Sequence, residues 1–338
     1  WGILLPIADG IKMLVKEDTV PAGADKVVFN LAPLVAAVAA MLVYAVIPFG
    51  PDTGHGALAG ADLNIGIFYI LAVGAVSLIA ILMAGWSSNN KYALLGAFRA
   101  VAELLSYEVP QVLSITVVVM LAGTMQMTQI VQAQTVPFIF PLFVTAIIFF
   151  ISGVAESGRT PFDLVEAESE IVAGYHIEYS AMKFSMFFLG EFVHAFAVCA
   201  VFATVFLNGW EGPILPPYVW FLIKSGAIFF IMMWIRGTLP RFRIDQLMAF
   251  NWKFLVPLSL VNLVVIAVTD TIVRTTLHFT PDGNPWAWGL ILFAVNLVML
   301  FIAFGLLGRG ARRGIEDRRT ITRMPEEPKP ATASAQTN

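Results

Sequence analysis

Seven carboxylates lie close together in the chain, between and within strongly apolar stretches. The stretch AESGRTPFDLVEAESEIVAGYHIEY, residues 155–179, carries six of them, and one more follows in the next apolar run. A carboxylate near a bilayer is costly unless it is paired, hydrated or proton-bound, so acids placed there commonly mark ion pathways. The chemistry open to these side chains is proton exchange. The seven are Glu156, Asp163, Glu166, Glu168, Glu170, Glu178 and Glu191.

The acidic segment has the pattern of a short helix. Pro161 interrupts the apolar run, and FDLVEAESEIVAG after it holds good helix formers, with Asp163 near the N-terminus, where an anion is favoured. Asp163, Glu166 and Glu170 would then share one face. Like charges at these spacings repel, and partial burial would favour proton binding near neutral pH. The segment predicts either a chain of exchangeable protons or an acidic loop that faces water.

Three acids in predicted spans favour proton exchange. Glu191 lies within a span, Glu108 opens another in SYEVPQVL, and Glu103 lies about one turn earlier. The alternative for each is a carboxylate satisfied by a neighbouring helix, and we expect that alternative for Glu103. Asp270 and Arg274, four residues apart near a helix end, predict a plain ion pair.

The elements that must position these acids are membrane-spanning helices. Hydrophobic residues make up 58% of the 338 residues, charged residues 13%, and the mean hydropathy is +0.81, outside the range of soluble domains. Runs such as FPLFVTAIIFFISGVA are apolar on every face, which favours helices over barrel strands. The sequence predicts an all-α polytopic membrane helix bundle with about eight spans: 29–49, 65–86, 109–132, 138–154, 182–208, 218–236, 253–273 and 286–308.

Charge placement predicts the orientation. Of the 20 Lys and Arg residues, all except Lys224 and Arg274 belong to one alternating set of loops with their flanking helix ends. By the positive-inside rule this set faces the cytoplasm, or a mitochondrial matrix. Its group WIRGTLPRFRIDQLMAFNWK would neutralise the acids, dock an acidic partner or anchor the chain at the interface. The set comprises residues 1–28, 87–108, 155–181, 237–252 and the tail from 309.

The ends of the chain differ from the spans between them. We expect three regions: an interfacial segment over 1–28, a transmembrane domain over 29–308 and a tail over 309–338 that is first basic and then disordered. The first region has apolar residues at helical spacing, typical of an amphipathic helix on a membrane surface. These are Ile3, Leu4, Ile7, Ile11, Leu14 and Val15.

Residues that hold redox groups are scarce. A single Cys199 excludes a disulfide within the chain and a cluster ligated by this chain's cysteines alone. A bis-histidine haem needs paired His in facing helices, but of four His only His194 lies well within a span. No G-x-G-x-x-G or P-loop motif occurs. We expect the chain alone to bind neither metal, haem nor nucleotide.

Four long stretches, in the right order, resemble one family. The chain is similar to the quinone-site membrane subunit of respiratory complex I, called the H subunit in bacteria and NADH dehydrogenase subunit 1 in mitochondria. The resemblance covers residues 4 to about 260. It rests on LLPIADGIKMLVKED, GWSSNNKYALLGAFRAVAELLSYEV, AESGRTPFDLVEAESEIVAGYHIEYSAMKFSMFFLGEF and WIRGTLPRFRIDQLMAFNWKFLVPLSL.

The resemblance implies roles for named residues. The acidic loop would lie beside a quinone cavity and link quinone reduction, driven by a partner's iron–sulfur cluster, to proton translocation. Arg159 would hold that loop or pair with its acids, and Asp9, Phe188 and Phe192 are candidates for the wall of the quinone channel. The implied partners are the other subunits of the complex and the lipid bilayer, with no nucleic acid. The implied proton carriers are Glu108, Glu156, Asp163, Glu166, Glu168, Glu170, Glu178 and Glu191.

The chain also departs from the family. The family usually reads AETNR where Ser157 and Gly158 give AESGR here, so we expect loop packing rather than chemistry to differ. The family has a first transmembrane helix ahead of LLPIADG, which we expect to be missing from this chain. A final span and a basic tail beyond the usual mitochondrial end favour a bacterial inner membrane.

Three other functions remain open from the sequence. A homologous complex of the membrane-bound hydrogenase type would share the acidic loop but not necessarily a quinone cavity. A freestanding secondary transporter would show discontinuous helices and inverted repeats, and no clear repeat is visible. A purely structural membrane scaffold would leave the intramembrane acids without a use.

Overall fold

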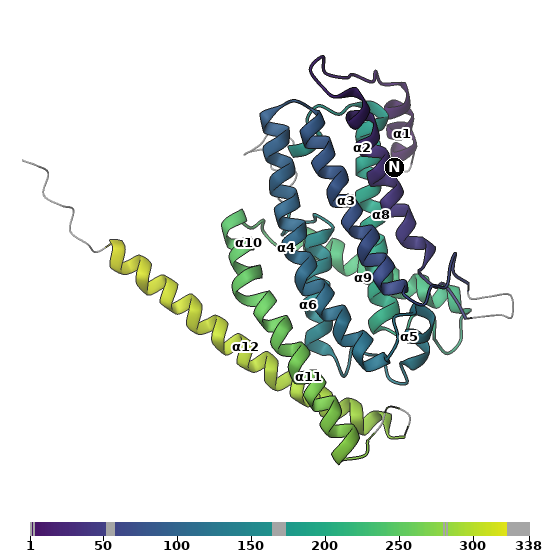
Figure 1. The fold of residues 1–338 in the computed structure, drawn as a ribbon, viewed down its shortest axis with the longest axis vertical. Helices are drawn as coiled ribbons and strands as arrows, with labels where there is room; N and C mark the ends of the chain where they lie inside the picture. Colours follow the sequence, from purple (N-terminus) through teal and green to yellow (C-terminus); the bar gives the residue numbers. More distant parts are fainter. Residues whose placement is uncertain are drawn as a thin grey trace, which may run out of the picture. The chain divides into compact units, whose positions relative to one another are not determined.

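Helices account for the regular structure of the described chain. The computed structural model describes residues 2, 4–51, 58–163, 174–279, 281 and 283–322. Within these ranges every regular element is a helix (Figure 1). Seven helices there are long and apolar enough to cross a membrane, and Phe143–Glu156 is a shorter apolar helix. The predicted all-α polytopic bundle is confirmed.

Several of the helices are joined or followed by short non-α turns. η1 and η2 are 3-10 turns, and η3 is a π-helical turn that joins α10 to α11, so that Ile244–Thr276 forms one continuous span. In chain order the elements are α1 (Leu5–Val15), α2 (Lys26–Leu42), η1 (Val43–Ala45), α3 (Gly66–Ser87), α4 (Lys91–Ala122), α5 (Met127–Ala133), α6 (Phe143–Glu156), η2 (Gly174–His176), α8 (Ala181–Phe206), α9 (Pro217–Thr238), α10 (Ile244–Phe250), η3 (Asn251–Leu255), α11 (Val256–Thr276) and α12 (Pro285–Thr322).

α4 differs most from the prediction. The span expected over 109–132 begins at Lys91 instead, where the Asn90 side chain caps the helix by accepting the Tyr92 N–H at 2.9 Å. It ends before Gly123, whose φ of 70° lies in the left-handed region. The prediction was wrong because Lys91, Arg99 and Glu103 interrupt the apolar run, whereas one side of this first half of α4 packs against protein. Glu103 and Glu108 therefore lie in the middle of a helix.

The long helices pack side by side in the first compact unit, Trp1–Leu297 (Figure 1). α2 packs against α3 and α8, while α4 packs against α3, α6 and α11. Close approach requires glycine at one crossing: a Cβ on Gly96 would lie only 2.8 Å from the Cα of Gly174. The absent side chain at Gly96 thus lets η2, which follows the acidic segment, rest directly on α4.

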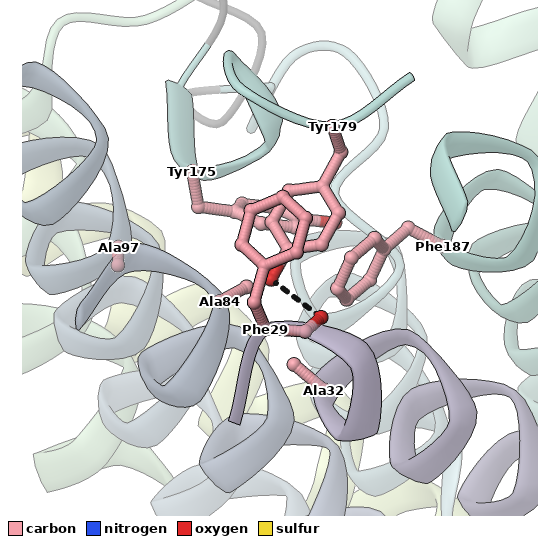
Figure 2. Close-up of a cluster of buried hydrophobic side chains, with 7 residues drawn as sticks. All are labelled: Phe29, Ala32, Ala84, Ala97, Tyr175, Tyr179 and Phe187. Atoms are coloured by element: carbon pink, nitrogen blue, oxygen red, sulfur yellow. Dashed lines mark hydrogen bonds between the residues drawn. The ribbon is translucent and has the colours of Figure 1, made fainter. Parts of the chain in front are cut away.

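Aromatic rings anchor the same region (Figure 2). The rings of Phe29 and Tyr179 stack with centroids 4.0 Å apart, and the Tyr179 hydroxyl donates to the Phe29 carbonyl oxygen at 3.2 Å. Tyr175 and Phe187 meet edge to face beside them at 5.3 Å. This cluster ties η2 to α2, α3, α4 and α8, so the chain that leaves the acidic segment is held in place.

Buried polar side chains join the helices. Asn262 of α11 donates to Thr145 of α6 at 2.7 Å, in the interior where an unmade bond would be costly. The predicted ion pair between Asp270 and Arg274 is confirmed at 2.8 Å, and Trp288 Nε1 also donates to Asp270 at 2.9 Å.

A second compact unit comprises Val298–Asn338. Its described part is the end of α12, which continues to Thr322 and so includes the basic part of the segment predicted as a tail. Residues 323–338 lie outside the described residues, and the disorder expected there stays a prediction.

Candidate functional site

The C-terminal end of α6 positions the first acid, Glu156. The chain leaves the helix through Ser157, whose hydroxyl donates to the Val154 carbonyl at 2.8 Å, and through Gly158, whose φ of 61° is left-handed. α6 contains 14 residues and is about 21 Å long, shorter than a hydrocarbon core of about 30 Å. Irregular backbone at that depth must be covered by protein. Ser157 and Arg159 are accordingly buried.

The left-handed turn predicts which substitutions the site accepts. Gly158→Val is expected to destabilise the chain by about 1–2 kcal/mol, because a β-branched residue is strained at this φ. Gly158→Asn, which restores the residue usual in the family, is the matched control and is expected to cost much less. Thermal unfolding of the detergent-solubilised protein measures both. Equal midpoints for the two variants would contradict this account of the turn.

Arg159 joins an acid to an aromatic ring. Its side chain is 5% exposed, and Nη2 lies 3.3 Å from Glu191 Oε1 of α8. The guanidinium carbon also lies 4.1 Å from the centroid of the Phe192 ring, a cation–π distance. Arg159 therefore connects the turn after α6 to α8 through both contacts. Its functional role stays a prediction.

Glu156 meets a histidine across the α6–α8 contact. His194 Nε2 lies 3.3 Å from Glu156 Oε1, and the two side chains are 16% and 19% exposed. The other oxygen of Glu156 is buried and has no hydrogen-bond partner among the described residues. A carboxylate in contact with a titratable imidazole is suited to accept or release a proton.

Two small cavities meet at this pair. One of about 80 Å³ is lined by Ser157, Glu191 and His194, among others, and one of about 30 Å³ by Glu108, Gln111 and His194. Glu156 lines both. A water molecule occupies about 30 Å³ of liquid and needs two to four polar partners, so both cavities have room and partners for water. The structure thus brings Glu108, Glu156 and Glu191 together.

Glu178 lies in a different cavity. Its Oε1 accepts a hydrogen bond from Asn90 Nδ2 at 2.7 Å, and both residues line an open cavity of about 800 Å³ with Trp86, Asn89 and Lys91. This placement holds Glu178 at the N-terminus of α4, away from the cavities around Glu156.

The rest of the acidic segment is described only at its start. Asp163 lies close enough to Glu103 to interact with it electrostatically. Residues 164–173 lie outside the described residues, so the expected helix and the positions of Glu166, Glu168 and Glu170 stay predictions.

The residues predicted for the quinone channel lie on α1 and α8. Asp9 pairs with Lys12 at 2.8 Å on α1, and Asp9 is 53% exposed. Phe188 and Phe192 pack together on α8 with ring centroids 5.1 Å apart. α1 lies against α8. The assignment of these residues to a quinone channel stays a prediction.

Two titratable residues were not assigned to the site from the sequence. Glu103 is 1% exposed, and neither carboxyl oxygen has a hydrogen-bond partner among the described residues. The expectation that a neighbouring helix satisfies this carboxylate stays a prediction. Arg99, Arg241 and Asp163 lie near enough to interact with it electrostatically. The other residue is His194. Its spacing of three from Glu191 was the available signal, because such residues share a helix face.

The histidine after the acidic segment gives a pH prediction. Burial lowers the pKa of His176 from 6.5 to about 4, and its ring packs edge-on against Phe184. The unfolded chain binds this proton below about pH 6.5 while the folded chain stays neutral, so stability falls as pH drops from 6.5 towards 4. The thermal unfolding midpoint is expected to decrease from pH 7 to pH 5, and this decrease should be smaller in His176→Phe than in wild type. An equal decrease in wild type and variant would show that His176 does not cause the loss of stability at low pH.

The described residues contain no group of three or more His, Cys, Asp or Glu side chains placed to hold a metal ion. The expectation that the chain alone binds no metal, haem or nucleotide stays a prediction.

Comparison with known proteins agrees with the four resembling stretches. A family model described as NADH dehydrogenase matches residues 1–267. The chain belongs to the NADH dehydrogenase family. The resemblance read from the sequence is therefore confirmed at the level of the family.

Curated members of this family resemble the chain over most of its length. The NADH-quinone oxidoreductase H subunit of Dehalococcoides mccartyi (strain CBDB1) is 52% identical over 316 residues, which cover 92% of this chain and 85% of the relative. The second NADH-quinone oxidoreductase H subunit of Syntrophobacter fumaroxidans is 51% identical over 270 residues, 78% of this chain and 82% of the relative. The corresponding protein of Geobacillus kaustophilus, with the same name, is 47% identical over 274 residues, 79% and 80% of the two chains.

Proposed function

We propose that this chain is the membrane subunit of a proton-pumping NADH:quinone oxidoreductase. It forms part of the quinone cavity and couples quinone reduction to proton translocation. Relatives about half identical in sequence are named as the H subunit of NADH-quinone oxidoreductase, which supports membership in such a complex. The partners are the other subunits, including one that carries an iron–sulfur cluster at the quinone site. The membrane is a bacterial inner membrane, with the basic loops and the tail in the cytoplasm.

The observation that carries the coupling role is the partly buried group of acids at the end of α6. Glu156 and Glu191 are held by His194 and Arg159, and cavities with room for water lie on both sides of Glu156. Charged groups buried at membrane depth are costly and are typical of ion pathways. A change in charge near the quinone would shift the protonation of these acids, because opposite and like charges move carboxyl pKa values in opposite directions.

The quinone role can be tested by labelling. A photoreactive quinone analogue added to membranes that hold the intact complex is expected to crosslink to this chain, and excess unlabelled quinone is expected to prevent it. Donor oxidation should stop when quinone is removed. Donor oxidation that moves ions without quinone, with no crosslink to this chain, would instead favour a complex of the hydrogenase type. Ion transport by the purified chain alone would favour a freestanding transporter.

A further inference from the structure

We propose that His194 is a proton-exchanging residue that works with Glu156 as a gate between the two cavities at the end of α6. This inference rests on the proposed function and adds to it a residue that the carboxylates alone do not supply. It follows from the place of the imidazole between the cavities, from its contact with Glu156, and from the acids around it.

The pair forms a shared wall of the two cavities. Gly74, Glu156 and His194 line both of them. A Cβ on Gly74 would lie 3.6 Å from Glu156 Oε1, an ordinary contact distance, so the carboxylate lies directly beside α3. Glu191 lines only the larger of the two cavities, and Glu108 only the smaller. A proton that passes between waters in the two cavities therefore meets Glu156 or His194.

The contact between the pair permits a balanced exchange. His194 Nε2 and Glu156 Oε1 are 3.3 Å apart. When a proton moves from Nε2 of the imidazolium to Oε1 of the carboxylate, an ion pair becomes a neutral pair, and the total charge does not change. The neutral carboxyl group can then release this proton to water on one side while the imidazole takes another from the other side. Each step moves one proton and needs no other reactant.

The surroundings of His194 contain groups that set its charge. Glu191 lies one helical turn before it on α8 and is held by Arg159. Glu108 faces it from α4 across the smaller cavity, and Tyr175 faces it across the larger one. Tyr44 of η1 donates to the backbone carbonyl of the adjacent Val193 at 2.7 Å. Acids lie on both sides of the imidazole, so the loss of any one of them would change how readily it exchanges its proton.

His194→Gln and Glu156→Gln, measured side by side in membranes with the intact complex, test the gate. Glutamine at 194 keeps hydrogen-bonding capacity but cannot carry the proton. We expect both variants to assemble and both to lose about tenfold or more of proton pumping and quinone reduction. The pH profile of His194→Gln should also change shape. His194→Gly, which opens space for a free imidazole, should regain part of its rate when imidazole is added, and this readout does not depend on the Gln variant folding.

The outcomes separate this inference from the proposed function. Wild-type rates and pH profile in His194→Gln, with Glu156→Gln impaired, would overturn the role of His194 and leave the proposed function standing. Wild-type rates in both variants would overturn both. Impairment of His194→Gln alone would contradict the pair. Failure of imidazole to restore any rate in an assembled His194→Gly complex would reduce His194 to a packing residue and overturn the gate.

Discussion

Arg159→Leu is expected to lower quinone reduction by at least about tenfold in assembled complex. The change removes the ion-pair partner of Glu191 at a place where the Arg159 side chain is only 5% exposed. Removal of one partner of a fully buried ion pair costs about 3–5 kcal/mol. The cost here is lower, because Glu191 is 28% exposed and solvent screens part of its charge. If about 1.4 kcal/mol of this cost destabilises the active conformation, the population of that conformation falls tenfold. Donor:quinone activity per assembled complex is the measurement.

Arg159→Lys is the matched control. It keeps the positive charge near Glu191 but loses the planar guanidinium that lies over the Phe192 ring. Its activity should fall between those of wild type and Arg159→Leu. Wild-type activity in Arg159→Leu would mean that Glu191 needs no cation beside it and that the turn after α6 is held by other contacts.

Glu156→Gln is expected to lower proton pumping and quinone reduction together, by about tenfold or more. Glutamine has nearly the shape of glutamate and can still contact His194, so assembly should hold, but it cannot bind and release a proton. Coupled steps slow together because each waits for the other. Proton movement and quinone consumption, recorded at the same time in sealed membrane vesicles, measure the effect.

Glu211→Gln provides the control for loss of a carboxylate. Glu211 is exposed, accepts a hydrogen bond from Asn208 at 2.6 Å, and lies in the connection between α8 and α9, outside the linings of both cavities. Its replacement should leave both rates unchanged. If Glu156→Gln moves protons at the wild-type rate and with the wild-type number of protons per quinone reduced, Glu156 has only a structural role and does not carry protons.

The membrane spans were predictable from the sequence where the burial of apolar residues in the bilayer alone decides them. Long apolar runs predict spans whatever their neighbours, and α8, α9 and the start of α12 lie close to the predicted ranges. The span predicted over 253–273 begins earlier, at Ile244. α4 was mispredicted because its first half is helical through protein contacts, such as the backbone of Gly174 lying against Gly96. The number of apolar residues in a segment does not reveal a contact with a segment that is distant in the sequence.

The site was predictable by residue type but not by partner. Acid spacing and the family resemblance identified Glu156 and Glu191, because charges in apolar surroundings are rare and visible in a sequence. The pairing of Glu156 with His194, and of Arg159 with Glu191, depends on how α6 and its following turn pack against α8. The burial of Glu103 depends likewise on which side of α4 faces protein.

Infrared difference spectra between complex with oxidised and with reduced quinone test the central claim most directly, since protonated carboxyl groups have their own C=O stretching bands. The account predicts a carboxyl band that changes on quinone reduction in wild type, is lost in Glu156→Gln, and is retained in Glu211→Gln. Identical carboxyl bands in wild type and Glu156→Gln would show that Glu156 does not change its protonation during the reaction, and would contradict its place in the coupling path.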